Sequence, residues 1–277
     1  MSEPVVAVRT RGRDGPCCAR SEQAFFCVSA LLFAVCAAVT IVWCAPMSVM
    51  GEMTMPGGWT MSMAWMRMPE QTWLGAATSF LGMWIVMMVA MMMPSLAPVL
   101  WRYRQAVGIK GEMRRDRLTL LVGFAYFCVW TVFGMAVFPI GVALATIEMQ
   151  QPALARVVPI AIGFVVLIAG AFQFTSWKAH QLACCREVPR CGSPLPADAG
   201  TALRHGLRFG LHCSYCCAGL TAILLVIGVM DVRAMAAVAA AITIERLAPA
   251  GERVARAIGV IVVAAGLLLI AQAARLA

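Results

Sequence analysis

Blocks of about 20 apolar residues alternate with shorter polar and basic segments along the whole chain. A helix needs about 20 apolar residues to cross the roughly 30 Å hydrocarbon core of a bilayer, so each block predicts one transmembrane helix. The backbone of a spanning segment must satisfy its own polar groups, which favours helices, and the alternation typical of a membrane β-barrel is absent. The predicted spans cover about 24–45, 73–93, 118–141, 157–174, 209–230 and 257–274.

A shorter apolar block at 234–248 leaves two arrangements open, because it is too short to be assigned as a span from its length. The first block is longer than a signal-peptide core and no small-residue cleavage site follows it, so we interpret it as a retained span. We therefore predict an all-α polytopic transmembrane bundle with six or seven spans. Residues 1–23 form a basic tail, and 24–277 form the transmembrane domain.

Composition supports this class, since 62% of the 277 residues are hydrophobic and 13% are charged. Soluble domains are typically about half apolar and a quarter charged, so no separate soluble domain is expected. The net charge of +9 does not indicate a nucleic-acid partner, because the basic residues are not gathered in one run.

The basic residues instead predict the orientation of the bundle. Lys and Arg accumulate in cytoplasmic loops. With a cytoplasmic N-terminus and seven spans, 18 of the 22 Lys and Arg residues lie on the inner side. We expect a multi-pass protein of the cell membrane, with the lipid bilayer as its surroundings.

A cluster of soft ligands lies near the inner start of the span at 209–230. Cys213 and Cys216 form a Cys-x-x-Cys pair, one helical turn apart, which is close enough to share a metal ion, and Cys217 and His212 extend the set. Thiolates suit Cu(I), Zn(II) and iron–sulfur clusters. The alternative is that these cysteines are small apolar residues that pack between helices.

Methionines form a second group, in the span at 73–93. Met83, Met87 and Met91 follow one another at intervals of four residues, so they share one stripe of a helix, which Met88 and Met92 widen. Thioethers are neutral soft ligands that favour Cu(I). The alternative is a stripe that faces lipid or fills the core.

A third group lies in the outer loop at 46–72. An exposed loop gains little from apolar thioethers, so we expect soft-metal capture there, with Trp59 and Trp65 as interfacial anchors in the alternative interpretation. The methionines are Met47, Met50, Met53, Met55, Met61, Met63, Met66 and Met68.

Three ionisable residues lie within or at the ends of the apolar blocks. Glu245 lies near the inner end of the short block, where a carboxylate is costly and often functional, and we include it among the candidate metal ligands. Arg246 beside it is also consistent with the membrane boundary. We expect Lys178 to extend toward the interface.

Other kinds of site find little support. The chain has no phosphate loop, dinucleotide fingerprint or nucleophile–base set, so catalysis is not expected. His180, His205 and His212 are the only histidines, too few for a multi-histidine oxidase site. The remaining cysteines show no ligand spacing and are interpreted as packing residues without a disulfide framework; they include Cys17, Cys18, Cys27, Cys36, Cys44 and Cys128.

The chain resembles the DUF2182 family, described as metal-binding integral membrane proteins, over about 73–270. The resemblance rests on Trp84-x-x-Met87-x-x-Ala90-Met91-Met92-x-Pro94, on Gln173-x-Thr175-x-x-Lys178 through Cys185-Arg186, on Gly210-Leu211-His212-Cys213-Ser214-Tyr215-Cys216-Cys217, and on Gly228-Val229-Met230 with Glu245. It departs at Gln181, where the family pattern has Cys, and at Arg246, where it has Lys. The resemblance implies metal binding.

Together these observations predict a membrane protein that binds a soft metal, with Cu(I) favoured and Zn(II) as the alternative. Its expected role is metal transport, handling or delivery to another membrane protein. Two alternatives stay open: a thiol-redox protein that cycles Cys213 and Cys216, and an assembly subunit without chemistry of its own. The predicted metal ligands are Cys213, Cys216, Cys217, His212, Met87, Met91, Met92 and Glu245.

Overall fold

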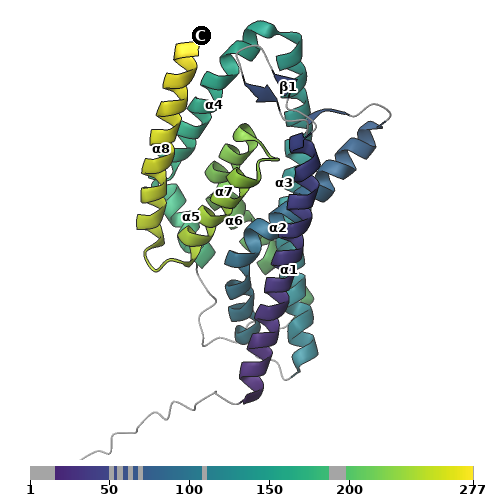
Figure 1. The fold of residues 1–277 in the computed structure, drawn as a ribbon. Helices are drawn as coiled ribbons and strands as arrows, with labels where there is room; N and C mark the ends of the chain where they lie inside the picture. The colour runs from purple at the N-terminus through teal and green to yellow at the C-terminus, as the bar shows by residue number, and fades with distance from the viewer. Residues whose placement is uncertain are drawn as a thin grey trace, which may run out of the picture.

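The computed structural model describes residues 16–49, 53–54, 59–61, 65–67, 71–107, 111–186 and 198–276. Eight helices and one short antiparallel strand pair occupy these residues, and the pair aligns Met53 with Met61 (Figure 1). The elements are α1 (Pro16–Val49), β1 (Met53–Thr54), β2 (Thr60–Met61), α2 (Trp73–Ala106), α3 (Glu112–Gln150), α4 (Pro152–Phe172), α5 (Ser176–Arg186), α6 (Ala199–Ile227), α7 (Val232–Leu247) and α8 (Gly251–Leu276).

Six of these helices are long and apolar enough to cross a membrane: α1, α2, α3, α4, α6 and α8. This confirms the all-α class and the six long predicted spans. The 16-residue α7 falls short of that length, and α5 forms where a loop was expected.

Most helices extend beyond the predicted spans. α2 does not stop at Pro94 but continues through Pro94 and Pro98 to Ala106. A proline removes one backbone hydrogen bond, and neighbouring helices make this tolerable in a bundle. α6 begins at Ala199, ten residues before the predicted start, because the Asp198 carboxylate caps it by accepting from the Thr201 amide. The cysteines of α6 therefore lie near mid-helix.

The two ends of the bundle can be told apart by their contacts. Trp59 donates its indole N–H to the Ala155 carbonyl at 2.8 Å, so the start of α4 lies at the end that holds the strands. We call this the hairpin end. α5 follows α4 at the opposite end, which we call the α5 end. In Figure 1, α1 begins at the lower end of the molecule and the C-terminus lies at the top.

α7 runs back between these two ends. It follows Met230, whose sulfur lies 3.7 Å from that of Cys44 late in α1, and begins at Asp231, which caps it. At its other end, Arg186 of α5 donates to the carbonyls of Ala248 and Pro249. The short block thus connects α6 to α8 as a helix that follows the seven-segment path.

Close helix packing positions α6 against α3. A Cβ atom added at Gly206 would lie 2.4 Å from the Val122 carbonyl oxygen, and one added at Gly210 would lie 2.9 Å from the Val129 side chain. Small residues let helix backbones approach closely in membranes. This contact brings Tyr126 of α3 next to the cysteines of α6.

Candidate metal centre

Three cysteines of α6 lie in the protein interior. Cys213, Cys216 and Cys217 are each at most 1% exposed. The sulfurs of Cys213 and Cys217 are 3.9 Å apart, as expected for residues one helical turn apart that face the same way. Cys185 of α5 joins them through a hydrogen bond with Cys216; this bond, together with burial, raises the pKa of the Cys185 thiol well above its usual value. We call these four residues the thiol cluster.

A guanidinium group borders the thiol cluster. Arg246 of α7 donates from Nη1 to the Cys213 sulfur at 3.2 Å and to the Ser95 hydroxyl of α2 at 2.9 Å. Its plane lies near the Phe209 ring, with 5.3 Å between the guanidinium carbon and the ring centroid. The Tyr126 hydroxyl is 2.9 Å from the same sulfur. Arg246 is 5% exposed, so its side chain points into the bundle.

A buried ion pair lies on the other side of Cys216. Lys178 of α5 donates to Glu245 Oε2 at 2.8 Å and to the Cys216 carbonyl at 2.6 Å, and both charged side chains are 1% exposed. The expectation that Lys178 reaches the interface is therefore wrong, because Glu245 provides a counter-charge inside the bundle. The predicted ligand Glu245 is engaged with this ammonium group.

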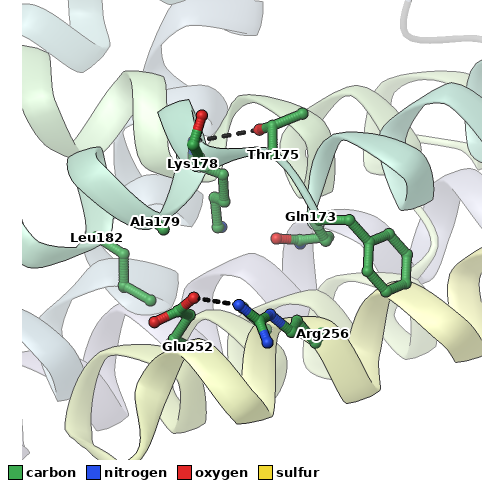
Figure 2. A pocket seen from close by; sticks show the side chains of 10 residues that line it. Gln173, Thr175, Lys178, Ala179, Leu182, Glu252 and Arg256 are labelled. Carbon is green, nitrogen blue, oxygen red and sulfur yellow. Dashed lines mark hydrogen bonds and ion pairs between the residues drawn. The ribbon is translucent and has the colours of Figure 1, made fainter.

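A polar pocket of about 220 Å³ leads toward this ion pair from the surface. Figure 2 shows Lys178 and Gln173 on one side of the pocket, and Glu252 and Arg256, which form an ion pair, on the other. Because Glu252 and Arg256 are more than half exposed, the pocket joins the surface of the α5 end to the buried Lys178.

His212 is half-buried one helical turn before Cys216, and its Nδ1 lies 2.7 Å from the Gln181 amide oxygen of α5. His212 is therefore hydrogen-bonded to Gln181, the position at which the sequence departs from the family pattern. Among the residues that the structure describes, no three His, Cys, Asp or Glu side chains are arranged to hold one metal ion.

The methionines of α2 face the protein interior. All six between 83 and 93 are at most 6% exposed, so the alternative of a lipid-facing stripe is wrong. Met92 is connected to the thiol cluster, because its carbonyl accepts from the Ser95 hydroxyl, which in turn accepts from Arg246. The stripe consists of Met83, Met87, Met88, Met91, Met92 and Met93.

Met87 and Met91 also line an apolar groove of about 490 Å³ between α1, α2 and α7. Met235 of α7 faces the same space, and no charged residue lines it among the described residues. We call it the methionine groove. The Cys44–Met230 sulfur contact lies where α7 begins, at the hairpin end.

The outer methionines lie mostly outside the described residues. The structure describes the backbone of Met47, Met53 and Met61 and places Met66, which is half-buried, but it does not cover Met50, Met55, Met63 or Met68. Trp59 donates a hydrogen bond to the Ala155 carbonyl of α4, and the Trp65 ring packs against Phe80 of α2 with 5.3 Å between ring centroids. Both tryptophans thus contact the bundle.

Several members of the site had no sequence signal of their own. Cys185 is 28 positions before Cys213 and carries no metal-ligand spacing with it, and Tyr126 is an ordinary aromatic residue in an apolar span. Apart from the family resemblance, Lys178, Glu245 and Arg246 were recognisable as charges near apolar blocks, and Glu245 was predicted as a metal ligand on that ground. The sequence did not show that each of these side chains has a hydrogen-bond or ion-pair partner inside the bundle.

Comparison with known proteins covers the same region. A family model described as PpoB2, copper chaperone, matches residues 81–269, which include α6, α7 and the methionine stripe of α2. This range lies within the region that carries the resemblance noted in the sequence. No curated protein and no solved structure matches the chain. Because the match spans more than half of the chain, this protein belongs to the PpoB2 family of copper chaperones.

Proposed function

We propose that this protein binds Cu(I) within the membrane and hands it to another membrane protein. The observation that carries the proposal is the pair of buried thiols, Cys213 and Cys217, 3.9 Å apart within the region matched by a copper chaperone family. Two sulfurs bound at about 2.3 Å to one ion lie roughly 3.8 Å apart at a tetrahedral angle and roughly 4.6 Å apart in a linear arrangement. The pair is therefore close enough to share one soft ion, with a small change in side-chain rotamers for linear coordination.

The ligand set favours Cu(I) over Zn(II). Structural zinc sites take four protein ligands, and no three His, Cys, Asp or Glu side chains of the described residues are arranged to hold one ion. Cu(I) is stable with two thiolates, and soft sulfur ligands select it. In this proposal the ion passes next to Cys216 and Cys185. Cys216 lies on the neighbouring face of α6, and its thiol is hydrogen-bonded to that of Cys185.

The methionine groove supports a direction of movement. Neutral thioethers bind Cu(I) without losing a proton, whereas thiols must lose theirs and then bind more tightly. We propose that Cu(I) moves from the hairpin end along Met87, Met91 and Met235 to the thiol cluster. With a cytoplasmic N-terminus in the cell membrane, this movement is inward, and the outer methionine loop captures the ion.

Burial of the thiols weighs against the redox alternative. Thiol–disulfide exchange requires that an attacking thiolate of a partner reach one sulfur, and Cys213, Cys216 and Cys217 are at most 1% exposed. A bare ion needs a much smaller opening. Metal in stoichiometric amount in the purified protein favours the copper proposal, and its absence with a dithiol–disulfide couple favours the redox alternative.

The test replaces Cys213 and Cys217 by Ser in the full chain. Removing both ligands is expected to abolish copper binding in detergent-purified protein prepared under reducing conditions, measured by elemental analysis. Cys128→Ser in α3 is the matched control, because Cys128 is a half-buried cysteine outside the thiol cluster. The proposal fails if the double variant keeps the copper content of the control. The double variant Cys213→Ser with Cys216→Ser tests the wider cluster in the same way.

A further inference from the structure

Arg246 is a buried cation without a carboxylate partner. Its Nη1 contacts Ser95 and Cys213, and its Nη2 has no hydrogen-bond partner among the described residues. No Asp or Glu of the described chain lies within ion-pair distance of it. A buried charge is costly unless an opposite charge compensates it. The nearest groups that can become anionic are the thiols that the proposed function assigns to copper.

The neighbouring buried charges do not change this balance. Lys178 and Glu245 form a pair of opposite charges at 2.8 Å, so together they contribute no net charge. Among the described arginine, lysine and carboxylate side chains around the thiol cluster, Arg246 therefore contributes the one charge that no other of them compensates. Its position is well defined, because the Ser95 hydroxyl of α2 and the Cys213 sulfur of α6 accept from the guanidinium and the Phe209 ring lies beside it.

Resting on the proposed function, we propose that Arg246 makes the thiol cluster selective for monovalent over divalent soft ions. Two thiolates and one monovalent ion carry a net charge of −1, which Arg246 neutralises. Two thiolates and one divalent ion are neutral, which leaves the Arg246 charge buried and uncompensated. Cu(I) thus gives an electrically balanced interior, and Zn(II) gives one with an excess positive charge.

This selectivity does not depend on how many protons the empty site holds. With two thiols, a monovalent ion releases two protons and changes the charge of the site from 0 to −1, whereas a divalent ion leaves it at 0. With one thiol already ionised, the monovalent ion releases one proton and leaves −1, whereas the divalent ion changes it to 0. In both cases the monovalent and divalent complexes differ by one charge beside Arg246. The ratio of the affinities for the two ions therefore measures the electrostatic effect of the Arg246 charge.

The test compares Ag(I) and Cd(II), two thiophilic ions of different charge that are not redox-active under these conditions. Apparent affinities are measured by competition with a chelator for the detergent-purified full chain. Arg246→Gln keeps a hydrogen-bond donor but removes the charge, and it should lower the Ag(I)/Cd(II) affinity ratio on the order of 100-fold, the effect of one charge about 5 Å away at a dielectric constant near 20.

Two variants serve as controls. Arg246→Lys retains the charge and should keep the ratio within about threefold of the wild-type value, since the ammonium remains beside the sulfur. Arg104→Gln removes another buried arginine, which is paired with Asp116, and should not change the ratio. If Arg246→Gln does not fold, Arg246→Met provides the neutral variant, because its unbranched side chain fills irregular space.

The outcomes separate this inference from the proposed function. An unchanged Ag(I)/Cd(II) ratio in the neutral variant, or an equal loss of both affinities, overturns the selectivity role and leaves Arg246 as a structural residue. A wild-type protein that binds neither Ag(I) nor Cu(I) overturns the proposed function itself. A ratio that falls in the neutral variant and is retained in Arg246→Lys supports the inference.

Discussion

Helix α7 borders both the thiol cluster, through Arg246, and the methionine groove, through Met235, but the two regions differ in charge. The cluster is surrounded by Arg246, by the Lys178–Glu245 pair and by the Tyr126 hydroxyl. The groove is lined by thioethers and alkyl groups, with the hydroxyls of Thr40 and Thr243 as its polar side chains. A cation gains strong stabilisation beside thiolates and little among neutral ligands. Under the proposed function, the comparison teaches that an ion would be retained in the first region and would move more readily through the second.

The largest expected effect concerns the charges around the cluster. Replacing Glu245 by Leu leaves Lys178 buried without a counter-charge, which should cost about 3–5 kcal/mol in the free energy of unfolding. Adding Lys178→Met should recover most of this loss, because an apolar pair of similar volume replaces the ion pair. Denaturant titration of the detergent-purified variants measures both.

The exposed pair at the rim of the polar pocket is the matched control for this prediction. Glu252 and Arg256 are 57% and 59% exposed, so Glu252→Leu should change stability by less than about 1 kcal/mol. If Glu245→Leu and Glu252→Leu lower the free energy of unfolding by similar amounts, burial does not determine how much each ion pair contributes to stability. The contrast between cluster and groove would then lose its electrostatic basis.

A smaller effect is expected when the groove loses its sulfurs. Replacing Met87, Met91 and Met235 by Leu keeps volume and apolarity, so each change should cost less than about 1.5 kcal/mol. Copper content at saturating copper should match the wild type, while accumulation in cells at limiting copper should fall. Elemental analysis measures the first and timed uptake the second. A copper content that falls as far as in the cysteine double variant would assign the groove to retention.

The smallest effect is expected from the outer loop. Replacing Met53, Met55, Met61, Met63, Met66 and Met68 by Leu removes the proposed capture ligands without touching the groove or the cluster. Accumulation should decrease only at limiting external copper, because mass action compensates at high copper. Unchanged accumulation at limiting copper, at normal protein level, would assign the loop to packing through Trp59 and Trp65.

The sequence predicts the spans well, because membrane crossing depends on local length and apolarity. It does not predict the helix ends: Asp198 starts α6 and Pro94 fails to stop α2, and both outcomes depend on caps and neighbouring helices. The spacing of Cys213 and Cys217 follows from the helical repeat alone. Their contact with Cys185 requires α5 to fold back onto α6, which no local pattern encodes.

Charges near apolar blocks show the same limit. Glu245 and Arg246 are adjacent in sequence, yet one faces Lys178 of α5 and the other faces Cys213 of α6. A charge at the end of an apolar block often marks the membrane boundary, so the sequence leaves that interpretation of Arg246 open beside a functional one. Only the tertiary contacts reveal that both side chains are buried. The burial of the α2 methionines is equally invisible, since methionines occur on several faces of that helix.

The shortness of α7 has a consequence for the lipid around the protein. Its 16 residues rise about 24 Å, which is roughly 6 Å less than the hydrocarbon thickness of a typical bilayer. Short segments are accommodated by local bilayer thinning, at a cost that grows with the mismatch. Because α7 carries Arg246 and Met235, we expect such a deformation, where α7 crosses the bilayer, to act on the cluster and the groove together. Acyl-chain length is then a means to adjust the proposed copper binding.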